Sequence, residues 1–596
     1  MEKTLTGLFT DYIEKINPDK KIFFTKEDVQ YIPYTSSELV RDIYSVIKFF
    51  QSIGLKENDS VAIISENRTE WVAVDFACMF MKLVSIPVYT SLAVSQIEYI
   101  LKNSDAKVCF VSNTLLLEKV VSVQSRLTDL KKIIIFNNVF NKVDFTKFSS
   151  EFITSFKDLI IDHELSHSEL IEKLKEFSGQ INPSDLVTII YTSGTTGIPK
   201  GVMLSHRNIH SNVLSCQKVL TINDKDVFLS FLPYSHAYER TTGYYLAFFC
   251  GAVIYYAQNI DTIARQLPET QPTIVITVPR LLDKIYNKLM KSGDDMDDGF
   301  KKKIFLWAIE FAKQPDINKK SVKWKIADKL VYKKIREKTG SRIRFFASGG
   351  GALNKTVGMF FDNIGIMILE GYGMTEASPV ISVNHPDKNK YGTVGKPVEG
   401  VSVKLSHENE ILISGELVME GYYKDEASTK DMIRDNWLHT GDVGEIDPDG
   451  YVRITDRKKS LIKTSGGKYV APTQIEDLLS RLPYIENVMV IGNERMYVTA
   501  VLVPEKNELQ SFAKKNNVPF DSYTGLISNK QLYKLISKDI DALQKDLASH
   551  ESVRKFVLLE EPFSIDSGEL TPTMKVKRKF VEEKFKDKIE SMYLKI

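Results

Sequence analysis

The sequence of 596 residues is short of several features that would narrow its class at once. It has four cysteines and no C-x-x-C pair, which excludes a disulfide framework and gives no sign of a zinc ribbon or redox dithiol. Lys and Arg number 79 against 77 Asp and Glu, so no basic excess points to nucleic acid. The most apolar stretch, residues 244–257, has 14 residues and is too short to cross a bilayer. These absences predict a reduced, cytoplasmic, multidomain protein without a nucleic-acid partner; a peripheral contact with a membrane stays open.

Two patterns along the chain indicate the fold. Residues 60–137 alternate strand-like and helix-like segments, and a second alternating block runs from a strand at 185–193 to another at 342–350. Such alternation is typical of parallel sheets with helices on both faces. From about residue 391, short β-like pieces with a DPDG turn at 447–450 predict a small antiparallel unit. Beyond Asp456 the pattern is mixed α+β.

The balanced charge divides unevenly at the same place. Residues 456–596 carry 24 Lys and Arg against 20 Asp and Glu, a net of +4, which leaves 55 against 57, a net of −2, for residues 1–455. We therefore predict a large domain, residues 1–455, and a small mobile domain, residues 456–596. The offset suits a small domain that closes on a polyphosphate.

The strongest local signal is YTSGTTGIPKGVMLSH, residues 191–206, which leaves the end of an apolar strand. Glycines let backbone N–H groups turn toward an anion, hydroxyls add donors, and lysine adds a positive charge. The loop does not match the Walker pattern G-x-x-x-x-G-K-[ST]. We predict that it binds phosphate through Thr192, Ser193, Gly194, Thr195, Thr196, Gly197 and Lys200.

This loop resembles the signature of the adenylate-forming enzymes, which include acyl-CoA synthetases, peptide-synthetase adenylation domains and luciferases. Further segments match in that family's order over about residues 185–580. LPYSHAYERTTGYY (232–245) and VPRLLDKIY (278–286) resemble the long-chain fatty acyl-CoA branch. The resemblance implies an α/β fold, in which the large domain has two βα sandwich-like subdomains and a small β-barrel, and a small mobile α+β domain follows.

The resemblance also implies roles for residues of the large domain. His236 lies between acyl chain and nucleotide, and the Glu239-Arg240 pair with its aromatic neighbours suggests the wall of an apolar acyl site. Glu376 holds Mg²⁺ that bridges the ATP phosphates, and Thr195 completes the metal shell. Contacts with the adenine, the α-phosphate and the reacting carboxylate fall to Gly350, Gly351, Tyr372, Gly373 and Thr375.

Further roles fall near and beyond the domain boundary. By the resemblance, Asp442 accepts hydrogen bonds from the ribose hydroxyls and Arg457 meets the ribose or a phosphate. Lys459 is the hinge, within residues 456–460, about which the small domain rotates. Lys463 and the Gly466-Gly467 turn approach the site in the second conformation, beside the pantetheine of CoA.

Near the C-terminus, GELTPTMKVKR (568–578) matches the segment whose lysine reaches the carboxylate and the α-phosphate. Many family members have Gly-Lys here, whereas this chain has Met574-Lys575, so the assignment between Lys575 and Lys577 stays open; we favour Lys575. The predicted catalytic residues are Thr195, His236, Glu376 and Lys575.

The function predicted from these motifs is ATP-dependent ligation of a long-chain fatty acid to coenzyme A, with Mg²⁺, through an acyl-adenylate. A fatty acyl-AMP ligase or acyl-carrier-protein synthetase would share every ATP motif and remains the alternative. Aromatic-acid ligases and amino-acid adenylation domains fit the 232–245 pattern less well, and a non-catalytic nucleotide-binding protein fits the intact motifs less well. Chain-length preference and oligomeric state, monomer or homodimer, are not determined by the residues.

Overall fold

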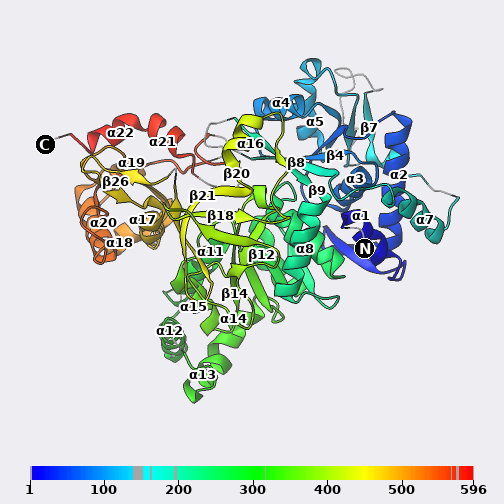
Figure 1. Cartoon of the computed structure of the whole chain (residues 1–596). Coiled ribbons are helices and arrows are strands. Elements are labelled where there is room, and N and C mark those ends of the chain that lie inside the picture. Colours follow the sequence, from blue (N-terminus) through cyan, green and yellow to red (C-terminus); the bar gives the residue numbers. More distant parts are fainter. Residues whose placement is uncertain are drawn as a thin grey trace. The chain divides into compact units, whose positions relative to one another are not determined.

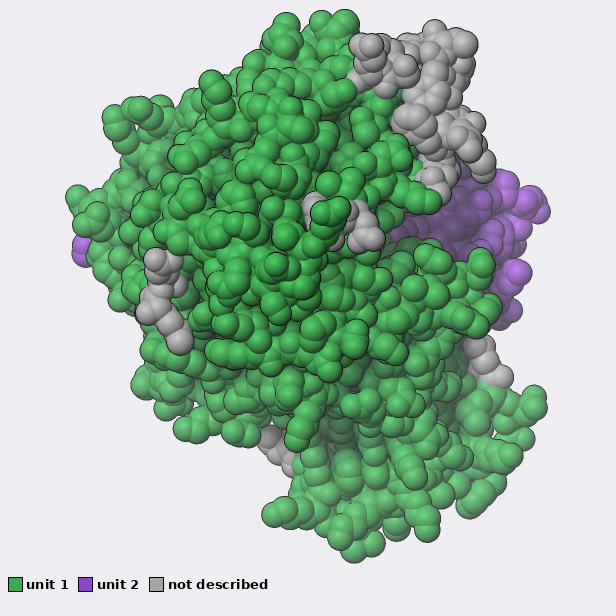
Figure 2. All heavy atoms as spheres, turned by 90° about the vertical axis from the view of Figure 1, so that its right-hand side faces the viewer, with its two compact units in different colours: residues 1–404, 412–440, 446–453 green, residues 405–411, 441–445, 454–596 purple. Residues whose placement is uncertain are grey.

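The computed structural model describes residues 3–137, 152–161, 164–192, 198–294, 296–315, 317–458, 460–564, 567–571 and 576–594. The chain, drawn as a ribbon in Figure 1, divides into two compact units, which Figure 2 shows in different colours. Unit 1 comprises residues 1–404, 412–440 and 446–453, and unit 2 comprises residues 405–411, 441–445 and 454–596. Each unit is described by itself.

The first sheet of unit 1 has eight strands in the order β19-β9-β8-β4-β3-β5-β6-β7. The strands from β8 to β7 are parallel to one another. Strand β9 is antiparallel to β8, and β19 is antiparallel to β9. All residues of β3 and β4 are buried, as expected for parallel strands covered on both faces. The bounds are β19 Gly421–Tyr422, β9 Lys200–Ser205, β8 Leu186–Thr192, β4 Val84–Val88, β3 Ser60–Ile64, β5 Ala106–Val111, β6 Lys132–Ile135 and β7 Ile153–Ser155.

The second sheet of unit 1 has nine strands in the order β16-β15-β14-β13-β12-β10-β11-β1-β2. The strands from β14 to β1 are parallel, and β15, β16 and β2 are antiparallel additions at the two edges. The bounds are β16 Lys396–Pro397, β15 Val380–Val383, β14 Ile368–Gly373, β13 Phe345–Ser348, β12 Ile274–Thr277, β10 Val227–Ser230, β11 Val253–Tyr256, β1 Lys21–Glu27 and β2 Gln30–Thr35.

Membership of the two sheets does not follow chain order. The hairpin β1-β2, near the start of the chain, joins the nine-stranded sheet through β11, and β19, far along the chain, joins the eight-stranded sheet through β9. Both sheets therefore need segments that are distant in sequence.

Helices flank both sheets, and their ends carry ordinary local signals. Thr35 and Glu38 form a capping box that starts α2, and Ser205 caps α8. The π-helix η4 (Glu239–Leu246) contacts α8. The main helices of this region are α1 Leu5–Ile13, α2 Ser36–Ser52, α3 Thr69–Phe80, α4 Val94–Asn103, α5 Thr114–Val121, α7 His167–Ser178, α8 His206–Leu220 and α10 Ile263–Thr270.

A group of helices follows β12 and β13 and lies in the lower part of unit 1 in Figure 1. Its members are α11 Pro279–Asp294, α12 Phe300–Ala312, α13 Val322–Ala327, the π-helix η6 Asp328–Tyr332, α14 Lys333–Glu337 and α15 Lys355–Asn363. A buried cluster that includes Leu282, Ala308, Tyr332 and Phe360 packs them on the nine-stranded sheet. Among the described residues, no helix combines the length and the apolar character needed to cross a bilayer.

A five-stranded sheet has the order β17-β18-β21-β20, with β22 pairing β21. Its bounds are β17 Ser402–Leu405, β18 Glu410–Ser414, β20 Ile433–Arg434, β21 Trp437–Ile446 and β22 Val452–Arg457. The DPDG turn joins β21 to β22, which confirms the predicted hairpin. Within the described residues this sheet does not close, so the predicted small β-barrel is an open sheet.

Unit 2 contains a three-stranded sheet of order β25-β26-β27 and the short hairpin β23-β24. Two buried clusters pack its helices on the sheet, one around Leu479 and Leu502 and the other around Val501 and Val581. Its bounds are β23 Ile462–Lys463, β24 Tyr469–Val470, α17 Pro472–Leu479, β25 Ile485–Ile491, β26 Val498–Pro504, α18 Lys506–Lys515, α19 Tyr523–Ile527, α20 Lys530–Leu543, β27 Val553–Leu558, α21 Arg578–Lys584 and α22 Lys586–Ser591.

Candidate active site

Four predicted segments of unit 1 come together because of strand direction. The parallel strands β10, β12, β13 and β14 lie side by side, so the loops that follow them emerge at one edge of the sheet. Those loops carry His236, the VPR segment at 278–280, Gly350-Gly351 and the turn that holds Glu376. Ligands of α/β sheets bind at this carboxyl edge.

Direct contacts join three of these loops. The Tyr238 hydroxyl donates to the carbonyl of Ala347 over 2.9 Å, and a Cβ added at Gly349 would lie 2.9 Å from the Tyr238 ring. Gly350 has φ +79°, a conformation that favours glycine, and Gly351 packs beside Pro279. Gly349 is therefore required by the close Tyr238 ring, and Gly350 by its backbone conformation.

His236 is half-buried in the loop before η4. Its Nδ1 accepts the backbone N–H of Tyr238 over 3.1 Å. This bond assigns the proton of the neutral imidazole to Nε2 and fixes the ring's orientation.

Glu376 is linked by hydrogen bonds and ring contact to the strand that follows the phosphate loop. The Tyr422 hydroxyl donates to Glu376 Oε1 over 2.8 Å, and burial together with Glu376 raises the pKa of Tyr422 far above its usual value, so the hydroxyl stays a donor. The Lys200 ammonium lies 5.1 Å from the centre of the Tyr422 ring. It also donates to Ser428 Oγ and lies 3.8 Å from Asp425 Oδ2.

The phosphate loop itself is anchored at both ends by a β-ladder. Thr192, the last residue of β8, pairs with Lys200, the first residue of β9. Ser193, Gly194, Thr195, Thr196 and Gly197 lie outside the described residues. Thr192 and Lys200 therefore fix only where the loop begins and ends.

In unit 2, Asp442 of β21 is buried and pairs with the exposed Arg457 of β22, with 3.0 Å between Oδ1 and Nε. The neighbouring Gly441 N–H donates to the buried Glu410 over 3.0 Å, and Lys458 lies 3.2 Å from the same carboxylate. The β21-β22 hairpin therefore holds Asp442 in a fixed position beside the positively charged Arg457.

The other predicted residues of unit 2 are only partly described. Lys463 is exposed in β23 with its ammonium 5.6 Å from the ring centre of Tyr469. Gly467 has φ +76° and no atom within 4 Å of an added Cβ, so backbone conformation is the reason for this glycine. Lys459 and Lys575 lie outside the described residues, whereas the backbone of Lys577 donates to the carbonyl of Glu569.

A family model described as AMP-binding enzyme matches residues 14–423, and one described as AMP-binding enzyme C-terminal domain matches residues 459–596. The chain belongs to the AMP-binding enzymes.

Curated relatives and solved structures agree with this membership. The chain is 30% identical to the long-chain-fatty-acid–CoA ligase FadD15 of Mycobacterium bovis, over 98% of this chain and 96% of that protein. It is 33% identical to long-chain-fatty-acid–CoA ligase 5 of Rattus norvegicus, over 90% and 80% of the two chains. The adenylation domain of a carboxylate reductase from Mycobacterium chelonae shares the fold, with TM-score 0.78 and 22% identity over 99% and 91% of the chains. The predicted α/β fold with a large N-terminal and a smaller C-terminal domain is confirmed, as is the adenylate-forming family.

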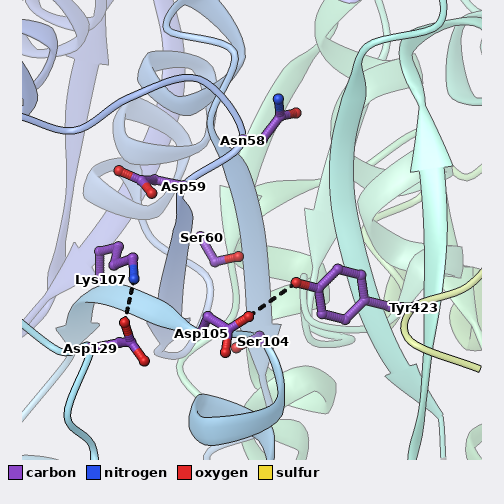
Figure 3. Close-up of a pocket in the computed structure, with 8 residues that line it drawn as sticks. All are labelled: Asn58, Asp59, Ser60, Ser104, Asp105, Lys107, Asp129 and Tyr423. Carbon is purple, nitrogen blue, oxygen red and sulfur yellow. Dashed lines mark hydrogen bonds and ion pairs between the residues drawn. The ribbon is translucent and has the colours of Figure 1, made fainter.

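One pocket of the AMP-binding enzyme is lined by other residues. It has a volume of about 240 Å³ and is lined by polar groups at the amino ends of β3 and β5 (Figure 3). Asp105 accepts from the Tyr423 hydroxyl, and Lys107 pairs with Asp129. None of the predicted site residues lines this pocket.

The Glu239-Arg240 pair of the AMP-binding enzyme is sealed inside the protein. Arg240 forms an ion pair with Asp75 of α3 and donates to Ser85 of β4 over 2.6 Å and to Thr188 of β8 over 2.8 Å. This guanidinium therefore fastens η4, which follows His236, to the eight-stranded sheet.

Glu239 gives this enzyme an expected pH dependence. Its carboxyl is fully buried and accepts only the Ser230 hydroxyl, over 2.6 Å, among the hydrogen bonds of the described residues; burial raises its pKa from 4.5 to about 8. Because the folded state holds this proton more tightly than the unfolded state, its contribution to stability is complete below pH 4.5 and is lost as pH rises toward 8. In Glu239→Gln, the free energy of unfolding should fall less steeply with rising pH, by up to about 1.4 kcal/mol per pH unit.

The measurement is urea unfolding at several pH values between 5 and 8, compared with the parent. Glu118→Gln on an exposed site serves as control. An unchanged slope in Glu239→Gln would show that the buried carboxyl is ionised in the folded protein.

Gly373, in the predicted nucleotide segment, tolerates no side chain. A Cβ there would lie 2.0 Å from the carbonyl oxygen of Pro379, the residue before the paired strand β15. Gly373→Ala should lower the free energy of unfolding by about 1–3 kcal/mol, the range for overpacked sites, and weaken AMP binding because the Glu376 turn must move. Gly179→Ala, whose nearest contact would be 3.6 Å, is the control for urea unfolding and AMP titration; equal stability of the two variants would contradict the steric argument.

Reasoning from the sequence alone missed Tyr422, Ser428, Asp75 and Tyr238. Tyr422 bonds to Glu376, more than 40 residues away along the chain. Ser428 bonds to Lys200, more than 200 residues away. No local pattern marks such partners, because their role depends on strand pairing between β19 and β9.

Proposed function

We propose that this AMP-binding enzyme joins a long-chain fatty acid to coenzyme A through an acyl-adenylate, with release of pyrophosphate and then AMP. One observation carries the proposal: the loops after β10, β12, β13 and β14 gather at one sheet edge, and Glu376 in the last of them is connected through Tyr422 to Lys200 beside the phosphate loop. The relatives named long-chain-fatty-acid–CoA ligases support the choice of acid and acceptor.

In the first step a carboxylate oxygen of the fatty acid attacks the α-phosphorus of ATP, the bond to the β-phosphate oxygen breaks, and pyrophosphate leaves. This chain's residues act mainly by positioning and by balancing charge. Thr192 and Lys200 hold the two ends of the loop that we assign to the phosphates, with Ser193, Gly194, Thr195, Thr196 and Gly197 between them. Gly350 and Gly351 leave room for the adenine and the carboxylate, and Tyr372, Gly373 and Thr375 complete the nucleotide contacts.

The donor set fits magnesium. Mg²⁺ prefers oxygen ligands and takes one or two carboxylates together with substrate phosphates. Glu376 offers a buried carboxylate whose Oε1 is oriented by Tyr422, and Thr195 would add a hydroxyl. When bound, the ion would neutralise charge on the ATP phosphates.

In the second step the CoA thiolate attacks the carbonyl carbon, the bond to the phosphate oxygen breaks, and AMP leaves. We assign Asp442 and Arg457 to the ribose and phosphate, and His236 to the boundary between acyl chain and nucleotide. We further propose a division into residues 1–455 and 456–596, with a hinge at Lys459, so that rotation withdraws Lys575 and presents Lys463 and Gly467. Such alternation limits hydrolysis of the reactive adenylate.

The test is ATP–pyrophosphate exchange across a series of carboxylic acids, followed by addition of CoA. We expect long-chain fatty acids to stimulate exchange and CoA to be consumed with formation of a thioester. Exchange without CoA consumption would favour the alternative, an acyl-AMP ligase or a synthetase for a carrier protein. Exchange that no fatty acid stimulates would overturn the substrate class.

Glu376→Gln should lower fatty-acid-dependent exchange at least about a hundredfold, because the variant loses a charge aimed at the phosphates. Tyr422→Phe should lower it about tenfold and raise the Mg²⁺ concentration needed for half-maximal exchange, since it removes only the group that orients the carboxylate. Tyr423→Phe, one residue away and bonded to Asp105, is the matched control. A Tyr422→Phe enzyme with unchanged Mg²⁺ dependence would separate Tyr422 from the metal site.

A further inference from the structure

The polar pocket of Figure 3 is built from residues that the proposed reaction does not use. It lies where four segments of unit 1 meet: the start of β3, the turn from α4 into β5, the loop before β6, and the residue that follows β19. Its volume of about 240 Å³ is below the range of about 300–1,000 Å³ typical of sites for drug-sized ligands, so it suits a smaller molecule. Apart from the ring of Tyr423 its lining is polar, which excludes an acyl chain as its occupant.

Carboxylates outnumber cations around this pocket. The Lys107 ammonium lies 2.5 Å from a carboxylate oxygen of Asp129. The hydrogen bond with Asp129 raises the pKa of Lys107, and the charges of Asp59 and Asp105 add to the rise, so three carboxylates act on one ammonium group. Asp105 has a second cation, Lys424, at 2.6 Å. Three carboxylates against two lysines leave one negative charge that a bound cation would balance.

Two groups of the pocket are available to a ligand. Asp59 forms no ion pair within the part of the chain that the structure describes, and one of its oxygens accepts the backbone N–H of Lys56 over 2.9 Å. Ser60 is only 5% exposed, yet its hydroxyl has no hydrogen bond to any described residue, although buried polar groups are normally bonded. In Figure 3 this hydroxyl points from β3 toward Tyr423. Asp59 therefore offers a charge, and Ser60 a hydroxyl, to a molecule in the pocket.

The lining fits other classes of small ligand less well. A divalent metal ion takes several oxygen ligands close together, and the described residues hold no group of three His, Cys, Asp or Glu side chains that could bind one. An anion would meet the surplus of carboxylates, and both nearby lysines, Lys107 and Lys424, already have carboxylate partners. An ammonium group beside Asp59 would form a charge-assisted hydrogen bond, and a hydroxyl group could bond to Ser60.

We propose that this pocket binds a small organic ammonium compound that also carries hydroxyl groups, that is, an amino alcohol. The ammonium group pairs with Asp59, and a hydroxyl group of the ligand bonds to Ser60. Binding of this ligand does not depend on the proposed reaction.

The pocket has a short connection to the residues assigned to the nucleotide. Tyr423 lines the pocket, and its backbone N–H donates to the carbonyl of Gly201, next to Lys200. The residue before it, Tyr422, bonds to Glu376. A ligand that packs against Tyr423 restrains this segment, so that ATP pays less to order Lys200 and Glu376 when it binds. We therefore expect the amino alcohol to tighten ATP binding, an effect that rests on the roles given to these two residues in the proposed function.

The test of binding is a titration of the full chain with 2-amino-1,3-propanediol, followed by the line widths of the ligand's NMR signals. We expect a dissociation constant on the order of 1 mM, which lies within the ceiling of about 1.5 kcal/mol per atom for six non-hydrogen atoms. Glycerol has the same carbon skeleton with a hydroxyl in place of the ammonium group, and it should bind at least about tenfold more weakly. Equal binding of the two compounds would overturn the assignment to a cation. An amine that does not bind well above this concentration would overturn the site.

Two pocket variants and a matched control locate the ligand. Asp59→Asn keeps an oxygen for the backbone N–H of Lys56 and should weaken binding of the amine at least about tenfold, whereas Ser60→Ala should weaken it about threefold. Glu57→Gln removes the same charge from a 65% exposed side chain that does not line the pocket, and it should bind the amine as the parent does. Equal loss in Glu57→Gln would reduce the effect to general charge, and unchanged binding by Asp59→Asn would overturn the site.

The effect on the nucleotide is measured as the dissociation constant of ATP, without fatty acid, in the presence and absence of saturating amine. We expect the amine to lower this constant about fivefold in the parent, the low end of typical couplings between sites, and to leave it unchanged in Asp59→Asn at the same concentration. An ATP dissociation constant that the amine does not change in the parent would overturn the connection to the nucleotide residues. Because no acid is present, failure of this coupling and failure of the proposed ligation are read separately.

Discussion

Lys575→Ala will lose acyl-adenylate formation by roughly a hundredfold to a thousandfold, the loss typical of removing one preorganised charge donor from a transition state. The same variant will keep its rate of thioester formation from supplied acyl-adenylate and CoA, because we assign Lys575 to the first step alone. The measurements are ATP–pyrophosphate exchange for the first step and thiol consumption for the second.

The control for this prediction is Lys577→Ala, two residues away. It should leave both steps close to the parent's rates, since we assign the contact with the carboxylate and the α-phosphate to Lys575. Equal loss of both steps in Lys575→Ala would refute its role in adenylation. Loss of exchange in Lys577→Ala with a normal Lys575→Ala would move the role to Lys577.

Asp75→Ala should lower the free energy of unfolding by about 3–5 kcal/mol, the cost of leaving one member of a buried ion pair without its counter-charge. Asp75 is 0% exposed and also accepts a hydrogen bond from the Tyr245 hydroxyl over 2.7 Å. The substitution therefore removes a buried partner of both Arg240 and Tyr245. Urea unfolding followed by tyrosine and tryptophan fluorescence measures the loss.

Two further variants separate a lost ion pair from general damage to the core. Glu399→Gln breaks the exposed pair between Lys218 and Glu399 and should cost no more than about 1 kcal/mol. The double change Asp75→Ala with Arg240→Ala should be less destabilised than the sum of its singles, because it leaves no buried charge. Strict additivity would show that the two side chains act independently.

Much of the first sheet could be predicted from apolar runs. The strand-like segments of the predicted block at 60–137 appear as β3, β4, β5 and β6, because strands buried on both faces leave a continuous apolar signal. The same signal could not assign strands to sheets. The strand at 185–193 opens the second alternating block of the sequence, yet β8 belongs to the first sheet beside β4.

The candidate site was predictable where one short segment supplies the chemistry. Glu376 lies in a strand–turn segment, and the glycines beside Asp442 predict a turn, although the structure places Asp442 within strand β21; both assignments follow from local pattern and resemblance. The environment of Lys200 was not predictable, because Ser428 and Tyr422 reach it through the pairing of β9 with β19. Arg240 likewise reads as part of an acyl-site wall in the sequence, whereas the structure gives it partners on α3, β4 and β8.

The exchange of strands between the two sheets has a consequence for synthesis on the ribosome. β1 ends at Glu27, but its parallel neighbour β11 starts only at Val253, so the edge of β1 that pairs with β11 waits for more than two hundred residues to be translated. At about 5–20 residues per second that wait lasts roughly 10–45 s. Phe23 and its neighbours stay exposed for this time, and no nascent chain that stops before β11 can complete the nine-stranded sheet. The hairpin β1-β2 therefore needs protection from aggregation throughout this wait.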